Sequence, residues 1–135
     1  EISAAAFTYL YHHFDGITWY IQYVLNMLYT SISDKSLLQE EDIKMAIDGI
    51  LSQQRFAYQA LLYQLTAKQK QVLIAIAQEG KPSSLMSQGF LQKHHLGAST
   101  VQGAVKALLD RDFITQDEGV YQLCDKFLEL SLRGN

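Results

Sequence analysis

Two histidine pairs and a single cysteine are the residues of this sequence best suited to metal binding or nucleophilic chemistry. The pairs are His12-His13 and His94-His95, and the cysteine is Cys124. Neighbouring residues on a helix point about 100° apart, so neither pair can hold one ion as residues four apart can. We therefore expect the histidines to be solvated or to lie at the edge of the core, and Cys124 to be a small buried apolar residue.

An acidic run and a glycine-lysine pair also suggest specific chemistry. Glu40-Glu41-Asp42 could supply oxygen ligands, but it equally suits the first turn of a helix, where the helix dipole stabilises negative charge. A phosphate-binding loop needs Gly-x-x-x-x-Gly-Lys-Ser/Thr. In the pair Gly80-Lys81 a proline follows, and Ala75 stands where the first glycine belongs. These residues do not combine a general acid, a general base and a donor that could stabilise an oxyanion. We therefore predict no enzymatic activity and no metal or cofactor site.

Helices must position these residues, because apolar residues recur at helical spacing and the chain has one proline. The pattern predicts a polar connection at Ser31–Ser36. Ser3, Thr66 and Ser99 are expected N-caps, and Thr66 and Ser99 each have a glutamine three residues later, as in a capping box. The predicted helices span 4–14, 18–30, 40–50, 53–65, 67–79, 87–94, 99–110 and 125–132.

The second half ends in a β-hairpin pattern. Two short β-prone runs, Phe113–Gln116 and Val120–Leu123, flank the turn Asp117-Glu118-Gly119. Three helices followed by a hairpin are typical of a winged helix-turn-helix, whose sharp corner suits the short link Leu96-Gly97-Ala98. The predicted fold class is mostly α, a small helical bundle followed by this winged domain, and an arbitrary α-bundle ending in a hairpin is the alternative. The expected core of the winged domain is Val101, Val105, Leu108, Leu109, Phe113, Tyr121 and Phe127.

Composition places a domain boundary near Leu65. Hydrophobic residues make up 48% of the 135 residues, which excludes a disordered tail, and the net charge of −3 gives no polycationic signal for nucleic acid. Seven of the eight tyrosines precede Leu65, and charge changes from −4 over 1–65 to +1 over 66–135. We therefore predict a helical subdomain at 1–65 and the winged domain at 66–135.

The helix predicted at 99–110 would enter the major groove if the domain bound DNA. Its outward positions contain one cation, and the wing tip Asp117-Glu118 would repel phosphate. Lys93 and Arg111 are the further basic residues nearby. We therefore expect protein binding rather than DNA binding, with a DNA-binding module of a transcriptional regulator as the alternative. The candidate recognition-helix surface is Ser99, Gln102, Gly103 and Lys106.

The helix predicted at 18–30 is apolar on two sides. A helix that is apolar all round is normally buried all round. Either neighbouring helices cover both sides, or one side is partly exposed and docks onto another body, as aromatic and Met residues often do. The first side consists of Ile17, Ile21, Val24, Leu25 and Leu28, and the candidate docking face consists of Trp19, Tyr20, Tyr23 and Met27.

Three segments, 16–22, 69–77 and 119–127, carry a resemblance to a known family. They resemble the C-terminal region of archaeal-type P-loop ATPases, a STAND/AAA+-like branch, and the likeness covers nearly the whole chain. The resemblance implies a helical lid at 1–65 and a winged helix at 66–135. It also implies a parent protein that binds ATP with Mg in an N-terminal core missing from this sequence.

The resemblance makes that ATPase core the first expected partner, with another protein as the alternative. A self-contained interaction domain without an ATPase parent is a third possibility. Glu1 opens the sequence without an initiator methionine or a basic leader, so we expect a piece of a longer, cytoplasmic protein. No apolar run reaches the roughly 18–20 residues that would span a membrane.

Overall fold

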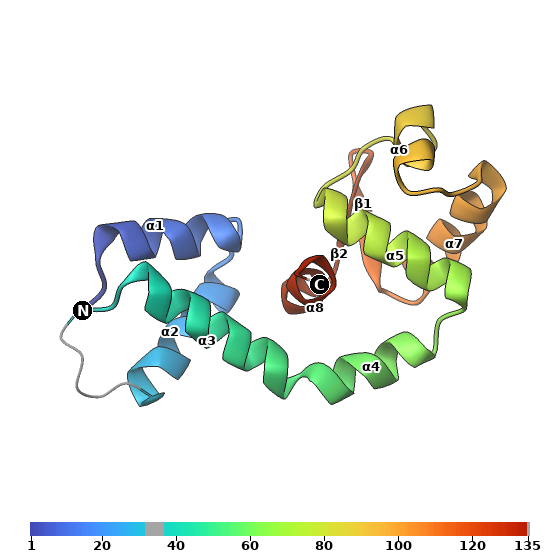
Figure 1. The fold of residues 1–135 in the computed structure, drawn as a ribbon. Coiled ribbons are helices and arrows are strands. Elements are labelled where there is room, and N and C mark those ends of the chain that lie inside the picture. The colour runs from blue at the N-terminus through green and yellow to red at the C-terminus, as the bar shows by residue number, and fades with distance from the viewer. Residues whose placement is uncertain (32–36, 135) are drawn as a thin grey trace. The chain divides into compact units, whose positions relative to one another are not determined.

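The computed structural model describes residues 1–31 and 37–134, which belong to two compact units, Glu1–Gln54 and Arg55–Asn135 (Figure 1). The fold is mostly helical with one two-stranded antiparallel hairpin, which confirms the predicted fold class. The connection predicted at Ser31–Ser36 lies, after Ser31, outside the described residues.

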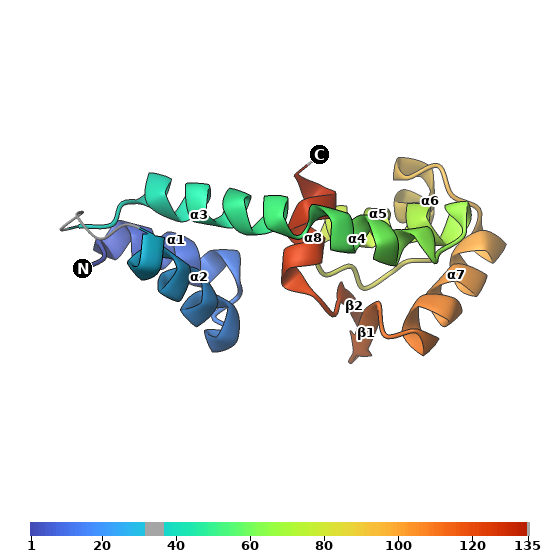
Figure 2. The same ribbon diagram turned by 90° about the horizontal axis from the view of Figure 1, so that it is seen from below.

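The first unit contains helices α1 (Ala4–His13), α2 (Thr18–Ser31) and α3 (Glu40–Gln53), and α3 packs against both of the others (Figure 2). Ser3 caps α1 as predicted, because its hydroxyl accepts from the Ala6 N–H at 3.1 Å. Each helix places one apolar stripe inward, which forms a shared core. The buried residues of this core include Ala6, Leu10, Phe14, Ile21, Val24, Leu28, Ile43, Ile47 and Ile50.

The turn between α1 and α2 requires a glycine. Asp15 and Gly16 both have positive φ, at 52° and 71°. A Cβ on Gly16 would lie 2.7 Å from the Tyr11 ring, closer than atoms can pack. At the start of α3, the Asp42 carboxylate accepts from the Gln39 N–H at 2.8 Å. The acidic run therefore forms a helix N-terminus, as one of its two interpretations predicted.

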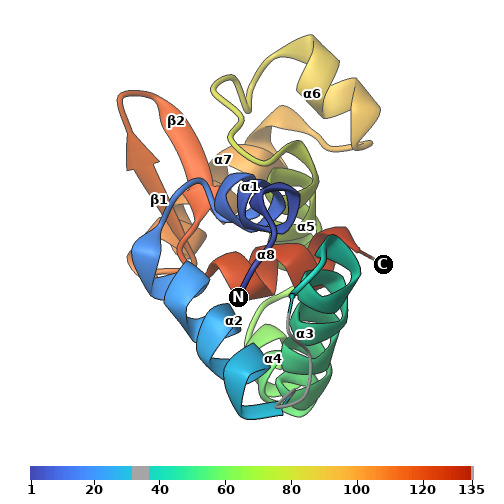
Figure 3. The same cartoon turned by 90° about the vertical axis from the view of Figure 1, so that its left-hand side faces the viewer.

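The second unit has the element order of a winged helix-turn-helix, and in Figure 3 its hairpin projects from the helices. The hairpin register pairs Asp117 with Val120 across a two-residue turn, and the Tyr121 N–H donates to the Pro82 carbonyl at 2.9 Å. The elements are α4 (Arg55–Tyr63), α5 (Ala67–Glu79), α6 (Gln88–Lys93), α7 (Ala98–Asp110), β1 (Ile114–Asp117), β2 (Val120–Leu123) and α8 (Lys126–Arg133).

Helix α4 belongs with the winged domain. The Tyr58 hydroxyl donates to the Asp125 carboxylate at 3.3 Å, and Arg111 Nη1 donates to the Gln64 carbonyl at 2.9 Å. The structure therefore divides the chain between Gln54 and Arg55, earlier than the predicted boundary at 65. The predicted boundary followed the tyrosine content, which falls after α4. The structural boundary lies before α4, because α4 belongs to the second compact unit.

One of the two capping boxes predicted in the second half is present. Thr66 Oγ1 accepts from the Gln69 N–H and Gln69 Oε1 accepts from the Thr66 N–H, both at 3.1 Å. The prediction for Ser99 is wrong. Helix α7 has Gly97 as its N-cap, without a side-chain bond, and the Gly97 carbonyl accepts from the Val101 N–H at 3.0 Å. The chain thus enters the helix before Ser99, which lies inside the first turn.

The core of the winged domain agrees with the predicted stripe in part. Val101 and Leu108 are fully buried, and Phe113 and Phe127 are buried as well. The other predicted core residues are only half-buried, because they lie at the edge of the α7 stripe or on the wing: Val105, Leu109 and Tyr121.

Hydrogen bonds join the start of α8 to α4 and the end of α8 to α5. Its N-cap Asp125, besides accepting from Tyr58, accepts from the Phe127 N–H at 2.9 Å. Near the other end, Arg133 Nε donates to the Ala77 carbonyl of α5 at 3.1 Å. Gly80, with φ +88°, leaves room for this arginine, since a Cβ there would lie 2.7 Å from Arg133 Nη2.

Candidate functional site

The predicted recognition-helix surface lies on the exposed side of α7. All four of its residues are exposed, while Val101, Ala104 and Leu108 on the opposite side are buried. A Cβ on Gly103 would have nothing within 4 Å, so the space above the middle of this surface is open. Lys106 is the one cationic residue in the sequence of α7. The surface Ser99, Gln102, Gly103 and Lys106 is thus accessible and nearly neutral, and its role in binding stays a prediction.

The wing tip is acidic and exposed. Asp117 and Glu118 both face solvent, and the turn residues Glu118 and Gly119 have φ values of 51° and 80°. Two successive positive φ values are typical of a type I′ turn, whose twist matches that of the strands. The exposed end of the hairpin therefore carries two carboxylates.

Two of the basic residues expected near a DNA surface are engaged elsewhere. Lys93 Nζ lies 2.8 Å from Glu79 Oε2, and Arg111 donates to the backbone carbonyl of Gln64, just after α4. The same Glu79 oxygen lies 2.8 Å from His94 Nε2. Hydrogen bonds from Lys93, then from His94, hold the pKa of Glu79 below its ordinary value. Glu79 thus ties α5 to the end of α6, a contact between residues 15 apart that helical periodicity cannot reveal.

The candidate docking face of α2 is partly exposed. Trp19 is 61% exposed and Tyr23 is 37% exposed, while Tyr20 and Met27 are half-buried. The Trp19 and Tyr23 rings stack at 5.5 Å between centroids. Ile21, Val24 and Leu28 are buried on the other side of α2, so Trp19 and Tyr23 lie on its more exposed side. Its role as a docking face stays a prediction.

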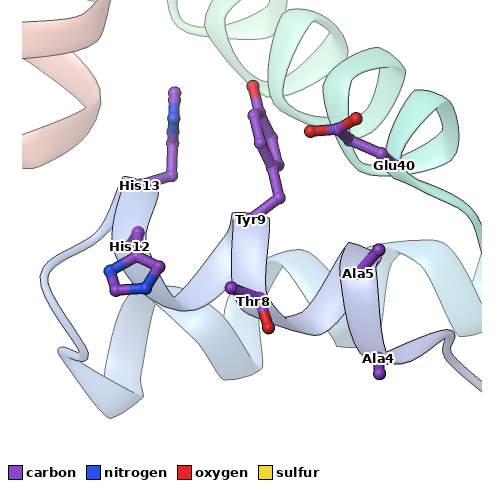
Figure 4. Close-up of a pocket in the computed structure, with 7 residues that line it drawn as sticks. All are labelled: Ala4, Ala5, Thr8, Tyr9, His12, His13 and Glu40. Atoms are coloured by element: carbon purple, nitrogen blue, oxygen red, sulfur yellow. The ribbon is translucent and has the colours of Figure 1, made fainter.

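A shallow hollow of about 650 Å³ between α1 and the start of α3 was not predicted (Figure 4). In Figure 4 the Tyr9 and His13 side chains extend in parallel beside Glu40, and their rings stack at 5.1 Å. Lys44 Nζ lies 5.6 Å from the centre of the Tyr9 ring. Burial, more than any charge, raises the pKa of the Tyr9 hydroxyl. The aromatic ring of Tyr9 therefore already contacts His13 and Lys44 within the first unit.

Among the described residues, neither the histidines nor the cysteine belongs to a group that could hold a metal ion. Over residues 1–31 and 37–134, no group of three or more His, Cys, Asp and Glu side chains is placed to hold a metal ion. The prediction of a buried Cys124 is wrong, because the residue is exposed where the chain leaves β2. Partial desolvation, then the carboxylates of Asp112 and Asp125, raise the pKa of its thiol. Cys124 is thus accessible but is a weak nucleophile at neutral pH.

Comparison with known families supports the architecture. A family model described as "probable winged helix domain" matches residues 56–134, more than half of the chain. The match begins at the start of α4, close to the division seen in the structure. No curated protein and no solved structure matches the chain. No helix in the described part of the chain has the length and apolar character needed to cross a membrane.

Proposed function

The chain belongs to the family described as "probable winged helix domain", and from this premise we propose that its winged helix binds a protein partner rather than DNA. The observation that carries the proposal is the charge on the surfaces a DNA duplex would meet. The exposed side of α7 offers Lys106, whereas the end of α7 and the wing tip offer Asp110, Asp117 and Glu118.

DNA affinity depends on several contacts between cations and phosphates, each of which releases counterions. Lys93 already shares its charge with Glu79, and Arg111 donates to the Gln64 carbonyl. A duplex seated on α7 would therefore gain little attraction and would approach an acidic wing. A protein partner needs no such charge, and the open space beside Gly103 lets another polypeptide approach α7 closely.

The resemblance of segments 16–22, 69–77 and 119–127 extends the proposal to the parent protein. We propose that the chain is the lid and winged-helix region of a P-loop ATPase, with ATP and Mg bound in the parent's core. The exposed aromatic face of α2 would then dock onto that core. We further propose that the chain itself has no catalytic role, since Cys124 has a raised thiol pKa and, in the part of the chain that the structure describes, neither histidine pair belongs to a metal-binding cluster.

Fluorescence anisotropy with labelled duplexes tests the choice between protein and DNA. At about 150 mM salt we expect dissociation constants no tighter than the ~10⁻⁴–10⁻⁶ M of non-specific binding. Lys106→Gln should change this weak binding only slightly. Nanomolar, sequence-specific binding that Lys106→Gln abolishes would instead establish the transcriptional-regulator alternative.

The sequence encoded upstream of Glu1 and a binding experiment test the ATPase parent. A P-loop motif upstream supports it, and a different upstream domain contradicts it. The parent's P-loop core can be produced as a separate protein and its binding to this chain measured. Trp19→Ala and Tyr23→Ala in this chain should each weaken that binding. Tyr29→Ala is the matched control, because Tyr29 is an exposed aromatic residue of α2 outside the docking face. Equal effects of all three substitutions would argue against a docking role.

A further inference from the structure

We propose that the outer edge of strand β1 binds an extended, basic segment of a protein partner, which adds a third strand to the wing. This inference rests on the proposed function, because it names the kind of segment that the winged helix binds. Three features support it: the direction of the backbone groups in β1, the cover on the two edges of the hairpin, and the charge around the wing tip.

The register of the hairpin determines which backbone groups point outward. The Cys124 N–H donates to the Phe113 carbonyl at 3.0 Å, across the pair that precedes the strands in the same register. Hydrogen-bonded and non-bonded pairs alternate along an antiparallel ladder. Three pairs further toward the turn, Gln116 and Tyr121 therefore face each other without mutual hydrogen bonds. The N–H and carbonyl of Gln116 point away from β2 as a result.

The two outer edges of the hairpin differ in their cover. On β2, the outward N–H of Tyr121 donates to the Pro82 carbonyl at 2.9 Å, so the segment after α5 covers that edge (Figure 3). On β1, Gln116 is exposed, and within residues 1–31 and 37–134 no hydrogen bond reaches its N–H or its carbonyl. A strand edge with open main-chain donors and acceptors is the template to which extended peptides add. The occupant that fits this edge is therefore an extended segment.

The charge around the hairpin favours a basic segment. Residues 110–125 contain five carboxylates and one cationic side chain, Arg111, which already donates to a backbone carbonyl. Asp117 and Glu118 are exposed, and in the part of the chain that the structure describes no ion pair joins either of them to a cation. An antiparallel strand bonded to Gln116 would place a side chain directly opposite Asp117, in a non-bonded pair where side chains lie close. Lysine or arginine at that position forms a favourable cross-strand pair, whereas an acidic side chain is repelled.

Amide NMR titration of the isotope-labelled full chain with a short synthetic peptide of alternating lysine and valine tests the proposal. We expect saturable shifts centred on residues 113–118 and slower hydrogen exchange of the Gln116 N–H, because that amide gains an acceptor. The control peptide has the same sequence with N-methylated valines, whose amides would face Gln116. It keeps the charge but loses the donors, so it should bind about tenfold more weakly.

Two positions in the chain separate the backbone edge from the charge. Gln116→Pro removes the outward N–H without breaking a bond to β2, and proline is tolerated at such edge positions. It should weaken peptide binding about three- to tenfold, and Gln116→Ala, which keeps the N–H, should weaken it clearly less. Asp117→Asn should weaken binding about two- to fivefold, as the loss of one exposed charge pair does. If the spectrum of Gln116→Pro shows a disrupted hairpin, the N-methylated peptide decides the test.

Equal binding of the two peptides, shifts that rise without saturation, or equal losses in Gln116→Pro and Gln116→Ala would overturn the proposal, because strand addition predicts none of these results. Association of the chain with itself that a folded Gln116→Pro variant abolishes would overturn it in favour of a second copy as the occupant. These outcomes leave the proposed function intact, since that proposal fails separately if duplex DNA binds the exposed side of α7 with nanomolar affinity.

Discussion

Glu79 connects two helices of the winged domain through one carboxylate oxygen, and this connection depends on its ionisation. Because Lys93 and His94 hold the pKa of Glu79 below the ordinary 4.5, its contribution to stability is complete above about pH 4.5. The contribution is lost as the pH falls through the lower folded-state pKa. Denaturant unfolding should therefore show stability falling on acidification more steeply in the natural chain than in Glu79→Gln. Parallel pH profiles would show that the carboxylate stabilises nothing.

Two hydroxyl residues with the same sequence pattern should behave differently when replaced. Thr66→Ala removes a capping bond and should cost about 0.5–2 kcal/mol of unfolding free energy. Ser99→Ala is the matched control and should cost nothing measurable, because Ser99 lies inside the first turn of α7 and caps no amide there. Chemical denaturation of both variants measures the difference. A larger loss for Ser99→Ala would mean that α7 begins later than the structure places it.

Cys124 provides a third prediction at this scale. The Cys124 residue is exposed, but its raised thiol pKa leaves little thiolate at neutral pH, so alkylation should be slower than that of free cysteine. Asp112→Asn removes one carboxylate that raises the pKa and should speed the reaction modestly. Timed alkylation followed by mass spectrometry measures both rates. Alkylation of the natural chain faster than that of free cysteine would contradict the raised pKa.

At the scale of elements, helix α7 separates the core from the candidate binding surface. Leu108 is fully buried, so Leu108→Ala should cost about 2–5 kcal/mol. Val105, three residues earlier in the same helix, is only half-buried and serves as the comparison, and Val105→Ala should cost clearly less. Thermal and denaturant unfolding give both values. Equal losses would mean that Val105 lies as deep in the core as the sequence pattern alone predicts.

The wing turn carries a residue ill suited to its backbone. Glu118 has φ 51°, a left-handed conformation that costs most L-residues roughly 1–2 kcal/mol but that asparagine adopts more readily. Glu118→Asn should therefore raise the unfolding free energy, by up to about 1 kcal/mol. Glu118→Gln removes the same charge without easing the backbone. A gain in Glu118→Gln as large as in Glu118→Asn would assign the effect to charge repulsion at the tip instead.

Elements were more predictable from the sequence than the contacts between them. Helical spacing and the Thr66 pattern gave α5 with its observed ends, because both signals are local. The same pattern wrongly predicted an N-cap at Ser99, because α7 already begins after Gly97. Neither Glu79 with Lys93 nor the hollow beside α1 could be predicted, since both depend on how helices pack. Cys124 was predicted to be buried but is exposed, because it follows the last residue of β2.

At the scale of the whole molecule, the chain consists of two units, and the structure moves their boundary to the start of α4. The hydrogen bonds from Tyr58 to Asp125 and from Arg111 to Gln64 make α4 part of the winged domain. The fragment 55–135 should therefore fold alone with a cooperative thermal transition. The fragment 66–135, cut at the boundary that composition suggests, should melt at a lower temperature. Identical melting of the two fragments would show that α4 adds no stability.

Because α8 is the last element of the winged domain, it affects the order in which this unit can fold during protein synthesis. Its N-cap Asp125 accepts a hydrogen bond from the Tyr58 hydroxyl, and Arg133 donates to the Ala77 carbonyl near the end of α5, 56 residues earlier in the chain. A ribosome releases α4 to β2 before α8, so the side of α5 that packs against α8 stays uncovered until α8 has left the exit tunnel. The nascent winged domain must therefore complete its folding late, and its exposed segments are where chaperones would act in the interval.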